Sequence, residues 1–156
     1  MIANCTITGN RIPSTTGQGY GYGAGIASAQ VTLSNSIVAG NFDEDGIAQD
    51  LADSTLDSNG HNVLGSTAPG SIPGDRQNVP AAQIFAQIDL RTGGGKLASS
   101  GVVLLRNAVN NPALSGADLL AARALDQTGV VRPLPAGSLP DIGAAELNQM
   151  LSTKTS

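Results

Sequence analysis

The sequence predicts an all-β fold, namely a right-handed parallel β-helix of a few rungs closed by an irregular C-terminal cap that contains short helices. The first reason is an internal echo, in which NCTITGN (4–10) matches NSIVAGN (35–41) at a spacing of 31 residues. The second is the alternation of polar and apolar residues within these stretches, which is typical of half-buried strands. The third is composition, because 20 glycines and only 3% aromatic residues in 156 suit narrow, repetitive packing.

A third, looser copy extends the repeat. TLDSNGHNVLG (55–65) echoes TLSNSIVAG (32–40), with Leu33 and Leu56 placed 23 residues apart. The copies end in Gly or Asn, which tolerate the positive φ angles that sharp corners need. We therefore expect short strands that turn after a few residues and stack on the next copy.

Stacked strands place equivalent side chains about 4.8 Å apart. We expect Asn10 to lie over Asn41 and Asn4 over Asn35, each pair forming part of an amide ladder. Asn62 stands in the third copy, and we expect the same structural role for it.

The chain divides into three parts. Residues 1–65 form the rungs, with a Gly-rich loop inserted at 11–23. Residues 66–147 form a last rung and the cap, and residues 148–156 form a flexible polar tail.

Within the cap, three segments have recognisable patterns. Pro80 and the apolar spacing in 79–88 predict a helix. The run GVVLLRN (101–107) predicts a buried strand. Residues 115–129 predict a short helix that begins after Ser115 and ends at Gly129.

Charge and composition exclude several classes of function. The net charge is −4 and no basic run occurs, so nucleic acid is not an expected partner. No apolar run approaches the roughly 20 residues that span a bilayer, and we find no signal peptide after Met1. Cys5 is the single cysteine, which excludes an intrachain disulfide.

Several short motifs occur along the chain in an order that resembles that of a known protein family. The motifs are, in order, VTLSNSIVAGN, SNGHNVLG, NNPALSGAD, DQTGVVRP and PDIGAAEL. Over residues 24–147 the chain thereby resembles the C-terminal region of bacterial choice-of-anchor Q domain proteins. The resemblance implies a pectate-lyase-like parallel β-helix, a secreted or cell-surface location and a longer repeat protein of which this chain is a fragment. The motif positions are Ser58, Gly60, Asn62, Gly65, Asp126, Gly129, Arg132, Pro133, Asp141, Ile142, Gly143, Ala144 and Glu146.

One candidate metal site is a calcium loop. Asn41, Asp43, Asp45 and Gly46 match positions 1, 3, 5 and 6 of an EF-hand loop. Position 12 is Ala52 rather than Glu, so Asp50 or Asp53 would have to substitute. The alternative is an acidic, solvated loop at a corner.

His61 is the only histidine and the second candidate. With Asp50, Asp53 or Asp57 it could bind a divalent transition metal or act as a general base. The alternative is a structural residue at the end of a strand. In the cap, Asp126 and Arg132 are expected to form an ion pair.

The open N-terminal rung is the expected contact surface. A rung edge exposes unpaired backbone groups, so we expect a homodimer through residues near Ile2 to Thr8. Reactive residues are few: Cys5 has no flanking motif, and Arg11 is the only basic residue in the rungs. A polysaccharide lyase is therefore not favoured.

These observations favour a non-catalytic secreted or cell-surface module that is adhesin-like or contacts carbohydrate. The alternative is a metal-dependent hydrolase with a site around Asp43–His61, within one chain or across the homodimer.

Overall fold

The computed structural model describes residues 1–12, 24–28, 30–43, 45–52, 55–99 and 101–147. Most of the predicted Gly-rich loop and all of the predicted tail therefore lie outside the described residues. In the described part of the chain, no helix has the length and apolar character needed to cross a membrane.

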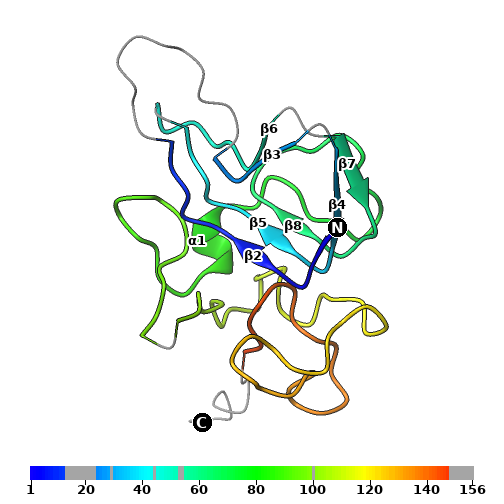
Figure 1. Cartoon of the computed structure of the whole chain (residues 1–156). Coiled ribbons are helices and arrows are strands. Elements are labelled where there is room, and N and C mark those ends of the chain that lie inside the picture. The colour runs from blue at the N-terminus through cyan, green and yellow to red at the C-terminus, as the bar shows by residue number, and fades with distance from the viewer. Residues whose placement is uncertain (13–23, 29, 44, 53–54, 100, 148–156) are drawn as a thin grey trace.

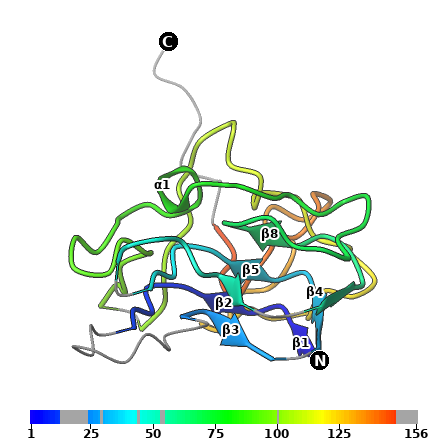
Figure 2. The ribbon, with the colours of Figure 1, turned by 90° about the horizontal axis from the view of Figure 1, so that it is seen from above.

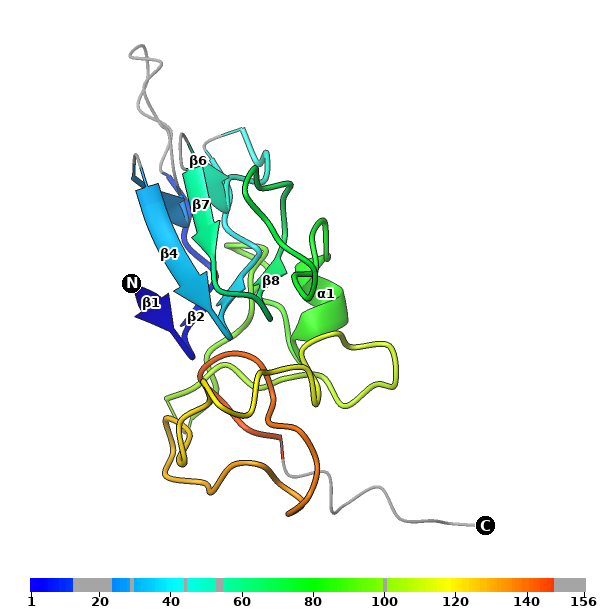
Figure 3. The ribbon, with the colours of Figure 1, turned by 90° about the vertical axis from the view of Figure 1, so that its right-hand side faces the viewer.

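Eight short strands, counted over the described residues, form parallel sheets that join three successive repeats at 2–12, 26–42 and 51–65. One sheet has the order β1-β4-β7, a second β2-β5-β8, and a third β3-β6. Figure 3 shows β1, β4 and β7 side by side. The strands are β1 (Ile2–Ala3), β2 (Thr6–Ile7), β3 (Ile26–Ala27), β4 (Gln30–Ser34), β5 (Ile37–Val38), β6 (Leu51–Ala52), β7 (Thr55–Ser58) and β8 (Val63–Leu64).

The pairing confirms that the echoing stretches are lateral neighbours. Thr6 pairs with Ile37, and Ile37 pairs with Val63, all in parallel register. The structure is thus mostly β, as predicted, and its strands are paired between repeats rather than within them. Arg76 adds an isolated parallel bridge to Val63, so the second sheet continues beyond β8.

The predicted alignment of Leu33 with Leu56 is wrong by two residues. Leu56 pairs with Val31, and Leu33 pairs with Ser58. From the β4–β7 pairing to the β5–β8 pairing, the third repeat has one more residue than the second between paired positions, because Leu33 and Ile37 are matched by Ser58 and Val63. A shift of two keeps every side chain on its face, so the alternating pattern could not reveal it.

Apolar side chains pack on both faces of the β2-β5-β8 sheet. Val38 and Leu64 belong to a cluster enclosed by the repeats, whereas Ile37 and Val63 belong to a cluster shared with the C-terminal part. Ile142 joins the second cluster from the far end of the chain. Figure 2 shows β2, β5 and β8 one above the next, and Figures 1 and 3 show the yellow-to-red C-terminal part lying below the strands. A sheet covered on both faces explains the near-continuous apolar pairs in its strands.

The C-terminal part contains less regular structure than predicted. Its helix α1 (Ala81–Ile84) is a single turn, and the described residues contain no other helix. The strand predicted at 101–107 is reduced to isolated antiparallel bridges from Val103 to Leu97 and from Leu105 to Phe85. The helix predicted at 115–129 does not form, and turns and one bridge replace it. Figure 1 shows this segment in yellow and orange below the strands.

Asn41 and Asp50 form a buried polar hub between repeats, and neither is exposed. The Asn41 Oδ1 accepts hydrogen bonds from the Asn10 N–H at 3.2 Å and the Asn10 amide at 2.9 Å, which confirms the predicted contact. The Asn41 Nδ2 donates to the Ile7 carbonyl and to Asp50 Oδ1 at 2.8 Å. One side chain therefore connects the first repeat to the segment that leads into the third.

The second carboxylate oxygen of Asp50 explains why residue 65 is a glycine. Asp50 Oδ2 is buried without a hydrogen-bond partner, and a Cβ at Gly65 would lie 2.3 Å from it. Close approach therefore requires Gly65. Burial raises the pKa of Asp50 above its ordinary value, while the two hydrogen bonds from Asn41 oppose that rise.

Gly65→Ala is expected to lower the free energy of unfolding by about 1–3 kcal/mol, the usual cost of overpacking a buried site. Urea unfolding measures it. The matched control is the same substitution in an Asp50→Ala background, where most of the crowding is gone and the added loss should be much smaller. Equal losses in the two backgrounds would show that Asp50 is not the cause.

Candidate functional site

The predicted calcium ligands do not form one set. Asn41 and Asp50 are engaged in the buried hub. Asp43 Oδ1 accepts hydrogen bonds from the Asp45 and Ile47 N–H groups at 3.0 and 2.8 Å, so it closes its own turn. Across the described residues, no three His, Cys, Asp or Glu side chains gather closely enough to hold a metal ion. Asp53 lies outside the described residues.

His61 and Asp57 also have separate partners. His61 Nδ1 lies 2.7 Å from the Gly116 carbonyl, for which it is the donor if that nitrogen carries the proton. Asp57 is exposed on β7 and accepts a hydrogen bond from Thr32 Oγ1 at 3.3 Å. The structure therefore does not assemble the transition-metal site predicted from these two residues.

His61 instead belongs to a column of corner residues. Asn4, Asn35 and His61 each stand two residues before a strand of the β2-β5-β8 sheet. Their φ angles are 52°, 46° and 57°, all left-handed. Asn and His are among the residues that adopt this conformation most readily, which accounts for their presence at the corner.

The corner side chains bind one C-terminal segment. Asn4 Nδ2 donates to the Ala121 carbonyl, and Asn35 Nδ2 donates to the Asp118 carbonyl while its Oδ1 accepts from the Asp118 N–H. With His61 at Gly116, the segment 116–121 runs along the whole column. These bonds use the backbone groups that a helix at 115–129 would need, and they replace the predicted Asn4–Asn35 ladder.

A second column lies one residue further along the chain. The Cys5 N–H donates to Ser36 Oγ at 3.2 Å, and the Ser36 N–H donates to Asn62 Oδ1 at 3.0 Å. Ser36 Oγ donates to the Ser34 carbonyl, and Cys5 Sγ donates in the same way to Ala3. Asn62 thus has the structural role expected of it, in a column that also contains serine and cysteine.

The cap is held by a buried ion pair that differs from the predicted one. Arg132 lies 3.6 Å from Glu146, and both side chains are almost fully buried. Its guanidinium also donates to the Asp141 and Gly143 carbonyls. Asp126 accepts backbone hydrogen bonds, including one from the Glu146 N–H at 2.9 Å, and no ion pair with Arg132 forms. Its oxygens are already occupied by the 126–130 turn and by Glu146.

Two carboxyl groups of the cap have shifted pKa values. Burial raises the pKa of Asp141 to about 6, and nearby Glu146 adds to this, while backbone donors and Arg132 oppose it. Partial burial raises the pKa of Asp126, but hydrogen bonds from Glu146, Thr128 and Val130 outweigh it and bring the pKa below its ordinary value.

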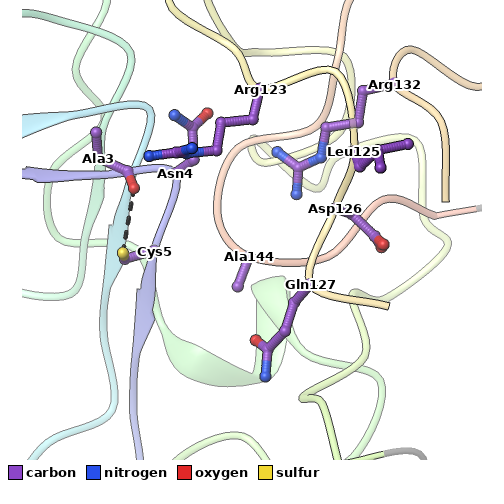
Figure 4. Close-up of a pocket in the computed structure, with 9 residues that line it drawn as sticks. All are labelled: Ala3, Asn4, Cys5, Arg123, Leu125, Asp126, Gln127, Arg132 and Ala144. Carbon is purple, nitrogen blue, oxygen red and sulfur yellow. Dashed lines mark hydrogen bonds between the residues drawn. The ribbon is translucent and has the colours of Figure 1, made fainter. Parts of the chain in front are cut away.

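A cleft of about 340 Å³ lies between the first repeat and this cap. In Figure 4 the guanidinium groups of Arg123 and Arg132 point toward the side lined by Asn4 and Cys5, whereas the Asp126 carboxylate points away. Asn4 Oδ1 is buried with no hydrogen-bond partner. The cleft is lined by Ala3, Asn4, Cys5, Arg123, Leu125, Asp126, Gln127, Arg132 and Ala144.

The cleft contains binding groups but no catalytic pair. The Cys5 thiol is bonded to the Ala3 carbonyl, and the lone histidine is engaged with Gly116. A nucleophile needs an adjacent base, which the described lining does not supply. We take this cleft as the candidate functional site.

Sequence reasoning missed this site because it joins residues 3–5 to residues 123–144. The only signal was indirect, since Asp126 and Arg132 stood out as cap residues. Comparison of the chain with protein-family models, with curated proteins and with solved structures found no match.

Asn35→Gly is expected to lower the free energy of unfolding by about 1–3 kcal/mol, because it removes two partly buried hydrogen bonds to Asp118. Glycine keeps the left-handed φ, so Asn35→Ala should cost about 1–2 kcal/mol more through backbone strain. Hydrogen exchange at the Asp118 amide should accelerate in both variants. An unchanged exchange rate would mean that Asn35 does not hold the segment.

The pH dependence of stability should carry the signature of Asp141. Its folded pKa of about 6 exceeds the ordinary 3.8, so the folded state holds the proton more tightly. The stabilisation that protonated Asp141 contributes is fully present below about pH 4 and is lost as the pH rises through about 6. Urea unfolding measures this. The free energy of unfolding of the wild type minus that of Asp141→Asn should fall by up to about 3 kcal/mol as the pH rises from 4 to 7. Parallel pH profiles would contradict this.

Proposed function

We propose that the chain is a non-catalytic module of right-handed parallel β-helix type, from a secreted or cell-surface protein of the choice-of-anchor Q kind. One observation carries the proposal: His61, Asp43 and Asp50, three of the side chains with the chemistry for a metal or hydrolytic site, are hydrogen-bonded to backbone groups of the chain. His61 bonds to Gly116, Asn41 to Asp50, and Asp43 to its own turn. In this reading, the repeats present a surface and the polar residues maintain it.

The motif residues behind the family resemblance support the same interpretation. Asn62 joins the second and third repeats, and Arg132 and Glu146 form the buried ion pair of the cap. Gly143 donates its N–H to the Asn35 carbonyl, which docks the DIGAAE motif onto the repeats. Each motif thus corresponds to a structural contact, as in a module whose sequence is constrained by stacking.

The partners in this proposal are those of a surface module. A carbohydrate contact, an adhesin-like role and a longer parent protein follow from the resemblance alone. A homodimer through the edge near Ile2–Thr8 stays a prediction, and sedimentation of the intact chain measures it.

His61→Asn tests the non-catalytic assignment. Asparagine stands at the equivalent corner in the other two repeats, so stability should change by less than about 1 kcal/mol. Elemental analysis should find no stoichiometric calcium or transition metal in either protein. Wild-type protein that carries one equivalent of metal, and loses it in the variant, would instead support a metal-dependent hydrolase around Asp43–His61.

A further inference from the structure

A second cleft, of about 350 Å³, lies between the later repeats and the segment 79–93. It is separate from the candidate functional site, because the two clefts have no lining residue in common. Glycines, alanines and larger apolar residues form its wall, among them Phe42, Val79 and Ile88. Among the residues that line it, Asp50 is the only one with a polar side chain.

Only one oxygen of the Asp50 carboxylate is satisfied. Its Oδ1 accepts hydrogen bonds from the Asn41 N–H at 3.0 Å and from the Asn41 amide at 2.8 Å. Its Oδ2 is buried, and no group of the described chain donates a hydrogen bond to it. This oxygen lies against Gly65, in the space that a Cβ at residue 65 would need, and both residues line the cleft. The unpaired oxygen therefore belongs to the floor of the cleft.

The Asp50 carboxylate also lacks a positive partner. Over the described residues the one ion pair joins Arg132 to Glu146, in the cap. Burial raises the pKa of Asp50, and the hydrogen bonds that oppose this rise come from Asn41 and not from a cation. Burying an acceptor without a donor is costly, so a ligand that brings a donor to Oδ2 would gain binding free energy there.

The chemistry of the wall selects the class of ligand. Asp50 would repel an anion, and a metal ion would need further ligands that the described His, Cys, Asp and Glu side chains do not supply. A purely apolar molecule would leave Oδ2 unpaired. A water molecule on Oδ2 would find no second polar side chain among the lining residues, whereas buried waters make about three hydrogen bonds.

We propose that this cleft binds a small organic ammonium compound, namely a primary or secondary amine in its protonated form with an apolar body. The ammonium N–H donates to Asp50 Oδ2, and the body packs against Phe42, Val79 and Ile88. The Phe42 ring adds to the attraction, because an aromatic face attracts a cation. Small-molecule sites are commonly apolar, with few polar groups that fix the orientation of the ligand. This inference goes beyond the proposed surface role and does not depend on it.

The probe is benzylammonium chloride, and benzyl alcohol is the neutral control of nearly the same shape. Each is titrated into the intact protein at neutral pH, and binding is measured by calorimetry and by the amide chemical shifts of Ala48 and Gly65. Benzylammonium should bind at one site, roughly tenfold or more tightly than benzyl alcohol, because hydrogen bonds between charged groups are the stronger ones.

Salt separates binding in the cleft from collection of the cation on an acidic surface, since the net charge of the chain is −4. Surface charges are screened by salt, whereas a buried pair is screened much less. Binding in the cleft should therefore weaken by less than about threefold between roughly 50 and 500 mM salt.

Asp50→Asn tests the carboxylate. The amide oxygen still accepts from Asn41, so the buried hub is kept while the charge is lost. Binding of benzylammonium should weaken by about tenfold or more, and that of benzyl alcohol should change by less than about twofold. Asp57→Asn is the matched control, because it changes the net charge equally at an exposed position on β7 and should leave both affinities unchanged.

Ala48→Leu tests the cleft without altering the carboxylate. Ala48 is exposed and pairs with Phe42 across an antiparallel bridge, so the two side chains stand on the same side. A leucine there should narrow the cleft and weaken the binding of both probes several-fold. Ala86→Leu, at an exposed position outside this cleft, should leave both affinities unchanged.

Three results would overturn the proposal. One is the absence of benzylammonium binding at millimolar concentration. Another is equal binding of benzylammonium and benzyl alcohol to the wild type. The third is benzylammonium binding that persists in Asp50→Asn or is abolished by salt, since the cation would then lie on the surface. If Asp50→Asn does not fold, the salt dependence and Ala48→Leu decide, and unchanged binding in Ala48→Leu then counts against the cleft.

Discussion

The structure depends on how the backbone is satisfied at each corner, where sheet pairing stops. A chain that turns after a short strand leaves N–H and C=O groups with no neighbour in the sheet, and burying them unpaired is costly. Two columns of side chains solve this problem. Asn4, Asn35 and His61 bind the backbone of 116–121, and Ser36 and Asn62 bind the N–H groups of the repeat before them. The C-terminal part is irregular because it follows these columns rather than a helical pattern.

The same demand explains why charged groups are buried in a chain with so few of them. Glu146 is paired with the Arg132 guanidinium, whose charge also acts on the nearby Asp141 carboxyl, and each carboxyl accepts backbone N–H groups that a turn leaves free. Burying two carboxylates with one cation is unfavourable, and the raised pKa of Asp141 expresses that cost. The cap thus gains a defined geometry in exchange for stability at neutral pH.

Sequence patterns were informative where structure is local and repeated. The echo of Asn4–Asn10 in Asn35–Asn41 correctly predicted parallel neighbours, because stacking imposes one spacing on every residue of a repeat. Sequence patterns failed where a contact with a distant part of the chain determines the local structure. The segment 115–129 has a helical pattern, yet side chains more than 80 residues away bind its backbone. The calcium pattern at Asn41–Gly46 likewise gave no sign that Asn41 is hydrogen-bonded to Asp50 in the buried hub. The cleft could not be predicted from the sequence, because the residues on one side of it give no information about the residues on the other side.

Corner capping also determines where the molecule is open. Each corner residue is held because the cap runs beside it, and the cap extends past the first repeat to residues 123–132. Beyond its last corner contact, at Ala121, the cap lines the cleft opposite Ala3, Asn4 and Cys5. The side chains of Arg123 and Arg132 on one side, and the buried Asn4 Oδ1 on the other, give the cleft its polar groups. Because its two sides lie far apart in the chain, the cleft exists only when the corner side chains hold the cap against the repeats.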